Sequence, residues 1–194
     1  MENNTCAESH QVCPWWVGYL MASPVRRILY QPARVLAPYV RPGMVVLEPG
    51  PGMGFFTLEL ARLVGQSGRV VAVDVQSRML DSLRRRADRA GILDRIDLRL
   101  ASKESLGVGD LAGKVDFTLA FAVVHELPSA AAFFREAALV SKPGSRLLLA
   151  EPRGHVTSQL FATELRAARD AGFMTLERPA LKSGHSALLE KARS

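Results

Sequence analysis

The stretch VVLEPGPGMGFF, from Val45 to Phe56, decides the fold of this 194-residue chain. Aliphatic residues from Met44 to Leu47 predict a buried strand that ends on Glu48. A strand that passes through glycines into a helix presents backbone N–H groups and the positive helix end to a ligand. We therefore expect a nucleotide-type binding loop at the three alternating glycines that follow, Gly50, Gly52 and Gly54.

Glycine spacing tests which nucleotide this loop accepts. The dinucleotide fingerprint needs glycine at its first, third and sixth positions. Counted from Gly50 the sixth residue is Phe55, and counted from Gly52 it is Thr57, so neither register fits. A glycine-proline turn without a ligand stays the alternative.

A helix is predicted after the loop by apolar residues at near-helical spacing up to Gly65, namely Phe55, Leu58, Ala61, Leu63 and Val64.

The string from Glu48 to Gly54, EPGPGMG, resembles motif I of the class I S-adenosylmethionine-dependent methyltransferases. The resemblance implies an α/β fold with a mostly parallel seven-stranded sheet, helices on both faces and an antiparallel last strand. A carboxylate at the strand end can offset the ammonium and sulfonium charges of that cofactor. The resemblance thus implies S-adenosylmethionine as the cofactor, contacted by Glu48, Gly50, Pro51, Gly52 and Gly54.

A second apolar run, Arg69 to Val73, ends on Asp74, twenty positions after Gly54. An acid at that place can accept both ribose hydroxyls, although a strand-end aspartate can also cap a helix. By resemblance, Val75 and Gln76 flank the ribose and adenine, and Met79 belongs to the same motif. Ser77 is expected to cap a helix that closes at Gly91.

A third strand is predicted from Ile96 to Leu100 and is followed by Ala101 and Ser102. By resemblance, this pair contacts the adenine. Many relatives carry an acidic residue where Ser102 stands, and the serine hydroxyl is a weaker partner for the adenine amino group.

The segment from Val115 to Val124 is almost wholly apolar, which predicts a central parallel strand buried on both faces. It resembles motif IV, whose exit lies over the transferred methyl group, and Phe121 is expected at the cofactor. His125 is the predicted general base because histidine titrates near neutral pH. It can equally be a loop histidine that bonds to backbone. Other candidates on the same sheet edge are Glu126, Glu151 and His155.

The rest of the chain completes the fold. LVSKPGSRLLLAEP resembles the helix end, turn and fifth strand of the family. The last two apolar runs are too close in sequence for a parallel crossover, so we expect antiparallel neighbours. The predicted elements are a helix capped by Ser129 and ending at Val140, a turn from Lys142 to Ser145, a strand from Arg146 to Ala150, a helix from Thr157 to Ala171, and strands from Phe173 to Arg178 and Ser186 to Glu190.

Residues 1–40 are predicted to form a polar tail and a short helical lid, and residues 41–194 the cofactor-binding methyltransferase domain. The aromatic residues between positions 12 and 40 either pack on the sheet edge or line the substrate pocket. Cys6, His10 and Cys13 are soft ligands, but a closed zinc site needs four, so no metal is expected. The alternative is a sensor that binds the cofactor or a metal through this tail.

The net charge of +6 arises from 25 basic and 19 acidic residues. Because the basic runs are interleaved with acidic or apolar residues, we interpret them as solvated helix faces and expect no nucleic-acid partner. The apolar segment from Trp15 to Ala22 is too short to span a bilayer. Two cysteines form no disulfide framework and suit a reducing compartment. We expect a cytoplasmic protein without membrane contact.

The residues after the fourth strand narrow the choice of methyl acceptor. Base-specific amino-methyltransferases carry an Asn/Asp-Pro-Pro-Tyr-like tetrapeptide there, whereas this chain has FAVVH from Phe121 to His125. No cysteine follows Cys13 that could serve as a nucleophile. A small-molecule acceptor is therefore expected, and the nearest resemblance is to the quinone-biosynthesis C-methyltransferases. A nucleotide-dependent oxidoreductase is the remaining alternative.

Overall fold

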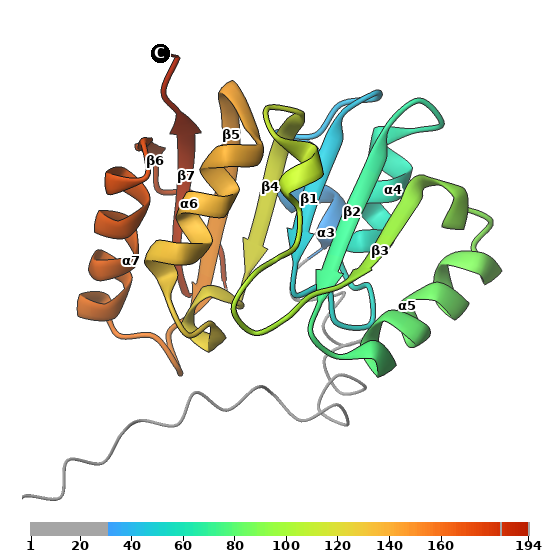
Figure 1. Ribbon diagram of the computed structural model, residues 1–194, viewed down its shortest axis with the longest axis horizontal. Helices are drawn as coiled ribbons and strands as arrows, with labels where there is room; N and C mark the ends of the chain where they lie inside the picture. The colour runs from blue at the N-terminus through green and yellow to red at the C-terminus, as the bar shows by residue number, and fades with distance from the viewer. Residues whose placement is uncertain (1–30, 183, 194) are drawn as a thin grey trace, which may run out of the picture.

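A single seven-stranded sheet organises the computed structural model, which describes residues 31–182 and 184–193. The strand order is β3-β2-β1-β4-β5-β7-β6 (Figure 1). The strands are β1 (Val45–Pro49), β2 (Arg69–Asp74), β3 (Ile96–Leu100), β4 (Val115–Phe121), β5 (Ser141–Pro152), β6 (Phe173–Glu177) and β7 (Gly184–Lys191).

Strand β7 is the reversed member of the sheet. It pairs antiparallel with β5 on one side and with β6 on the other, whereas β1 pairs parallel with β2 and β4. Only a short connection joins β6 to β7, and such a connection permits antiparallel pairing alone. The predicted α/β fold, with a mostly parallel seven-stranded sheet and an antiparallel last strand, is confirmed.

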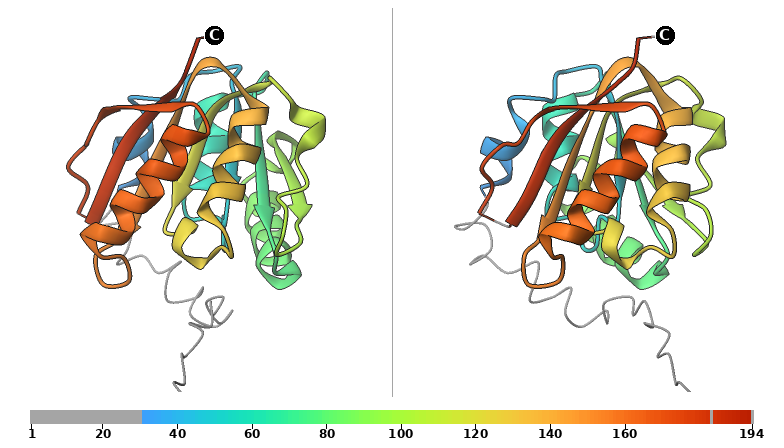
Figure 2. Two further views of the ribbon diagram at one scale, coloured as in Figure 1. Left: turned by 60° about the vertical axis from the view of Figure 1, so that its left-hand side comes forward. Right: turned by 90° about the vertical axis from the view of Figure 1, so that its left-hand side faces the viewer.

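Helices cover both faces of the sheet, as predicted (Figures 1 and 2). Helices α6 and α7 lie on one face, and α3, α4 and α5 lie on the other. The helices are α3 (Pro32–Leu36), α4 (Thr57–Val64), α5 (Ser77–Arg89), α6 (Ala130–Val140) and α7 (Ser158–Asp170), with short 3₁₀ turns η1 (Leu93–Arg95), η2 (Gly109–Leu111) and η3 (Val124–Glu126).

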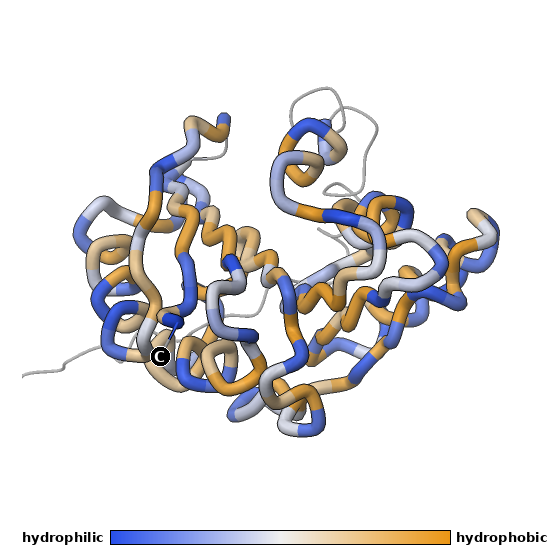
Figure 3. The backbone as a smooth tube through the Cα atoms, turned by 90° about the horizontal axis from the view of Figure 1, so that it is seen from above, coloured by the Kyte–Doolittle hydropathy of each residue, from blue (hydrophilic) through white to orange (hydrophobic). Residues whose placement is uncertain are grey.

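Alternate residues of each central strand enter opposite cores. On β5, Leu147 and Leu149 pack toward α6 and α7, while Leu148 packs toward α3, α4 and α5. All three side chains are fully buried. This two-sided burial explains the continuous apolar strands, which form the hydrophobic centre in Figure 3.

Strand β4 ends at Phe121, three residues before the predicted end at Val124. Ala122 has a left-handed backbone conformation with φ of +55°, which a strand cannot continue through. The chain then forms η3. The apolar character of Val123 and Val124 reflects burial in a turn.

Two other predictions were wrong in detail. Ser77 is the first residue of α5 and does not cap it; Gln76 occupies the N-cap position, and its amide donates to Asp74 Oδ1 at 2.9 Å. The predicted turn from Lys142 to Ser145 belongs to β5, whose register with β4 shifts there. The cap at Ser129 is confirmed, because its hydroxyl accepts from the Ala132 amide at 3.1 Å. The remaining predicted element ends differ by one or two residues.

The described part of the predicted lid packs against the core. Leu36 and Val40 are buried together with α4 residues. The ring of Tyr39 stacks on that of Phe117, with 5.9 Å between the ring centroids. The rest of the predicted lid and the Cys6, His10 and Cys13 group lie outside the described residues. Among the helices that the structure describes, none has the length and apolar character needed to cross a membrane.

Candidate functional site

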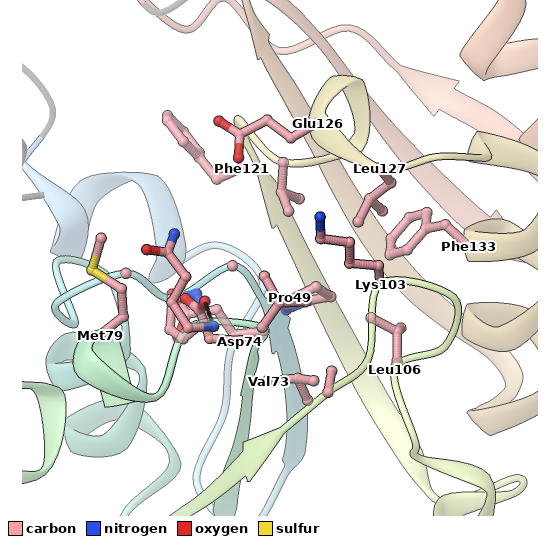
Figure 4. Close-up of a pocket in the computed structure, with 18 of the residues that line it drawn as sticks. Pro49, Val73, Asp74, Met79, Lys103, Leu106, Phe121, Glu126, Leu127 and Phe133 are labelled. Atoms are coloured by element: carbon pink, nitrogen blue, oxygen red, sulfur yellow. Dashed lines mark hydrogen bonds between the residues drawn. The ribbon is translucent and has the colours of Figure 1, made fainter. Parts of the chain in front are cut away.

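A cavity of about 410 Å³ opens at the carboxyl ends of β1, β2, β3 and β4 (Figure 4). This is where open α/β sheets bind ligands, since loops diverge from the strand ends. The cavity is lined by every residue predicted to contact the cofactor except Gly54, namely Glu48, Gly50, Pro51, Gly52, Asp74, Val75, Gln76, Met79, Ala101, Ser102 and Phe121.

The three glycines of the β1 exit have different roles. All have positive φ, at +65° for Gly50, +54° for Gly52 and +85° for Gly54. A Cβ on Gly54 would lie 2.4 Å from Leu83 Cδ1 of α5, so this glycine serves close packing of the loop. A Cβ on Gly52 would meet no atom within 4 Å, so its open side is available to a ligand.

Glu48 is a buried carboxylate with an unsatisfied oxygen. Its side chain is 3% exposed, and Oε2 has no hydrogen-bond partner among the described residues. Burial raises the pKa of Glu48 to about 8; the nearby Thr57 hydroxyl opposes the rise, and the charge of Asp74 adds to it. A cationic ligand in the cavity would supply the missing partner and favour the ionised form. The ammonium and sulfonium of the predicted cofactor fit this requirement.

Asp74 occupies the end of β2, the neighbouring strand to β1. Burial raises its pKa to about 6, although hydrogen bonds from the backbone of Gln76 and Gly52 oppose the rise. The charge of Glu126 across the cavity also raises this pKa. Its carboxylate lines the cavity in Figure 4, where it can accept hydrogen bonds from a sugar. Asp74 also accepts from the Gln76 amide just before α5, and its role toward the ribose stays a prediction.

The loop after β3 forms the wall opposite the glycine turn. Ser102 Oγ accepts from the amides of Glu104 at 3.2 Å and Ser105 at 3.1 Å. The loop is also tied to α6, because Glu136 Oε2 accepts from Ser105 Oγ and from the Leu106 amide, each at 3.0 Å. The Ser102 hydroxyl oxygen therefore orders the loop, and its proton stays available for a ligand.

The two predicted catalytic residues lie on opposite sides of η3. Glu126 lines the cavity, and Figure 4 shows its carboxylate beside Phe121 at the rim. His125 does not line the cavity; its Nδ1 lies 2.5 Å from Oε2 of the fully buried Glu151. Glu151 and His155, the other candidates, are also absent from the cavity wall. Of these four residues, Glu126 alone borders the space where a reaction can occur.

Several lining residues were missed by the sequence analysis. Lys103 lies beside the apolar side chains of Leu127 and Phe133 in Figure 4, with its amine pointing away from them, and Leu106 lies below it. These residues follow strand ends or belong to helix α6, without a local motif. Their only sequence signal is position after a strand, which identifies the edge of the sheet but not the direction of a side chain.

Comparison with known proteins places this geometry in context. A family model described as "Methyltransferase domain" matches residues 41–182. A protein named ubiquinone/menaquinone biosynthesis C-methyltransferase UbiE from Brucella canis is 31% identical over 134 residues, which cover 68% of this chain and 49% of that protein. The protein of the same name from Erwinia tasmaniensis is 36% identical over 115 residues, covering 58% and 44%. The chain thus spans less than half the length of these relatives.

A solved structure supports the same fold. A SAM-dependent methyltransferase from Aquifex aeolicus superimposes with a TM-score of 0.78 and 24% identity, over 92% of this chain and 98% of that protein. At this identity the similarity shows the fold.

Two glycine substitutions separate packing from ligand contact. We expect Gly54→Ala to destabilise the fold by about 1–3 kcal/mol, because the new methyl group overlaps Leu83 and the backbone is strained. Gly52→Ala adds strain only, on the order of 1 kcal/mol, but its methyl group enters the ligand side of the turn. We expect about tenfold weaker binding of S-adenosylhomocysteine. Thermal unfolding and titration calorimetry measure the two effects. Equal losses of stability in both variants would contradict this division.

Proposed function

We propose, since the chain belongs to the methyltransferase domain family, that it transfers a methyl group from S-adenosylmethionine to an apolar small molecule. Two features of one cavity carry the proposal. Glu48 has a carboxylate oxygen without a hydrogen-bond partner among the described residues, and Gly52 has free space where a side chain would stand. Family membership supports the cofactor, and the apolar cavity wall supports the class of acceptor.

The residues at the β1 and β2 ends would hold the cofactor. Glu48 would pair with its cationic amino acid part, Gly52 would allow close backbone approach, and Asp74 would accept from the ribose hydroxyls. Val75, Met79 and the Ala101–Ser102 pair would enclose the adenine. When bound, S-adenosylmethionine supplies a methyl group that is already activated on a sulfonium. The main task of the protein is therefore alignment, which can lower a barrier by roughly 7–11 kcal/mol.

Glu126 is the proposed general base. Its half-buried carboxylate borders the cavity, and its charge acts on both Asp74 and His125. An acceptor that must lose a proton on methylation would give it to this carboxylate. His125, which we predicted as the base, directs Nδ1 to Glu151 and lies off the cavity wall.

The acceptor is proposed to be an apolar ring that carries a hydroxyl group. Leu106, Leu127 and Phe133 form an apolar wall, with Lys103 among them as a cation that can pair with an acceptor oxygen. The named C-methylation activity of the UbiE relatives, on ubiquinone and menaquinone precursors, agrees in chemical class. We propose no nucleic-acid acceptor, because these side chains offer apolar contact to a small ring.

Residues 1–40 are proposed as a lid over this cavity. Pro32 and Ala33 lie beside Phe55, and Phe55 belongs to the rim of the cofactor cavity. The preceding 30 residues therefore join the described chain close to the cavity mouth. Both tryptophans of the protein, Trp15 and Trp16, lie in that stretch.

The pKa values of the site predict pH-dependent cofactor binding. Glu48 and Asp74 must be ionised to pair with the ligand, and their pKa values are raised to about 8 and 6. Affinity for S-adenosylhomocysteine should therefore rise as pH increases from 5 to 8, with release of protons. Asp74→Asn should weaken binding by about 1.5–3 kcal/mol and remove the part of the pH dependence near 6. Calorimetry in buffers of different ionisation enthalpy counts the protons. The exposed Asp94→Asn is the matched control, and a Kd independent of pH would exclude these roles.

A panel of ring acceptors tests the proposed chemistry. We expect transfer of a labelled methyl group to 1,4-dihydroxynaphthalene or a related hydroxylated ring, and none to an oligonucleotide. Glu126→Gln should lower kcat on the order of 100-fold, because it loses a general base, and leave S-adenosylhomocysteine affinity nearly unchanged. Glu104→Gln, another carboxylate on the same cavity, serves as the control. Unchanged kcat in Glu126→Gln would refute the assignment of the base.

Tryptophan fluorescence tests the proposed lid. Because Trp15 and Trp16 are the two tryptophans of the chain, the emission reports on this segment alone. We expect a blue shift when S-adenosylhomocysteine saturates the protein, since closure would bury the indoles. A Trp16→Phe variant should retain a smaller shift. Emission that stays constant at saturation, as judged by calorimetry, would argue against a lid.

A further inference from the structure

A second group of ionisable side chains lies behind the cavity wall. It comprises Glu151 at the end of β5, Glu164 on α7 and His125 on η3. Glu151 is 0% exposed and Glu164 is 2% exposed. None of the three lines the cavity. Buried carboxylates are costly, so their presence here needs a physical reason.

Both carboxylate oxygens of Glu151 contact the start of η3. Oε1 accepts from the Val124 amide at 2.8 Å, and Oε2 lies 2.5 Å from His125 Nδ1. One carboxylate thus binds the backbone of the first residue of the turn and the side chain of the second. Because β5 lies inside the sheet, between β4 and β7, these two contacts tie the turn to the sheet.

The opposite side of the same turn is the cavity wall. Phe121, Val123, Glu126 and Leu127 all line the cavity, and they flank the residues that Glu151 holds. Ala122 precedes η3 by two residues, and its φ of +55° is strained for a residue with a Cβ. Such a conformation persists only where neighbouring contacts over-determine it. Ala122 contributes one contact itself, by donating to the Ala150 carbonyl at 2.7 Å.

We propose that Glu151 and His125 are positioning residues, which hold η3 and thereby orient Glu126 at the cavity. The role of Glu126 as base rests on the proposed function. The contacts of Glu151 with η3 do not rest on the proposed function, since they are contacts within the protein alone. His125 acts through the turn and touches no reacting atom in this assignment.

The charges around the pair favour a protonated histidine. Burial alone would lower the pKa of His125, but its hydrogen bond to Glu151 and the charges of Glu151 and Glu126 together raise it. The His155 ring stacks on His125 with 5.8 Å between the ring centroids, and His185 stands opposite Glu151 in the backbone register of β5 and β7. On α6, the helix packed beside η3, Arg135 is exposed to solvent.

Glu164 adds an uncharged acid to this group at neutral pH. Burial and the charge of Glu151 raise the pKa of Glu164 to about 8, and neither of its oxygens has a hydrogen-bond partner among the described residues. Because this pKa is raised in the fold, the stability it contributes is present at low pH and is lost as pH rises from about 4.5 towards 8. Above that range, a second carboxylate charge would compete with Glu151 for His125.

Nuclear magnetic resonance of the full chain tests the positioning role. Histidine ring signals report the pKa of His125, amide exchange reports the Val124 hydrogen bond, and the side-chain carboxyl carbon of Glu126 reports its environment. In Glu151→Gln we expect the pKa of His125 to fall by about one unit or more, Val124 exchange to rise about tenfold or more, and the Glu126 signal to lose its step at the His125 titration. Glu59→Gln, a carboxylate on the opposite face in α4, should change none of these.

Two further variants guard against a folding defect in Glu151→Gln. His125→Gln keeps the Val124 bond to Glu151, so the Glu126 step should vanish while Val124 exchange rises by a smaller factor than in Glu151→Gln. Glu164→Gln should leave the Val124 bond intact and reduce the fall in melting temperature between pH 5 and 8. An unchanged pKa of His125 in Glu151→Gln, together with an unchanged Glu126 signal in both the Glu151 and the His125 variants, would overturn the proposal. These readouts use no acceptor or cofactor, so they stand apart from the test of methyl transfer.

Discussion

The burial of two carboxylates at adjacent strand ends is the constraint from which the site follows. Glu48 and Asp74 are 3% and 8% exposed, and each has a raised pKa because it has left water. An apolar core would exclude such groups, and a pocket for a neutral ligand would gain nothing from them. A ligand with cationic groups and sugar hydroxyls can offset the free-energy cost of burying both carboxylates. Gly52, the middle one of the three alternating glycines, leaves room for that ligand beside them.

The segment after β4 places a residue that lines the cavity next to a residue that contacts the sheet. Neighbouring residues of η3 face opposite ways, so that Glu126 meets the cavity and His125 meets Glu151. A short turn cannot fix a side chain by itself, because its few backbone bonds leave it mobile. The buried carboxylate of Glu151 compensates from the sheet. A site whose reacting group stands on a loop can be rigid in this way without adding residues to the cavity.

The two halves of the cavity are lined by different kinds of groups. Backbone and strand-end acids dominate the half at β1 and β2, which suits a constant ligand such as a cofactor. The other half is lined by side chains from the β3 loop, the segment after β4 and α6, where the apolar Leu106, Leu127 and Phe133 stand beside charged Lys103, Glu104, Glu126 and Glu136. Such side chains can change without disturbing the sheet, so this half can be adapted to one acceptor while the fold stays the same.

The sequence by itself determined the sheet, its helices and the cofactor edge, because those depend on local pattern. Apolar runs, alternating glycines and strand-end acids are read directly from neighbouring residues, and Glu48, Gly52 and Asp74 were identified in that way. Only the tertiary structure decided that Glu126, and not His125, borders the cavity. The direction of each side chain depends on the φ of Ala122 and on Glu151, which lies 26 residues further along the chain than His125. The partnership of Glu151, Glu164 and His125 joins three elements, and no local pattern records it. Long-range contacts of this kind exist only once the chain has folded.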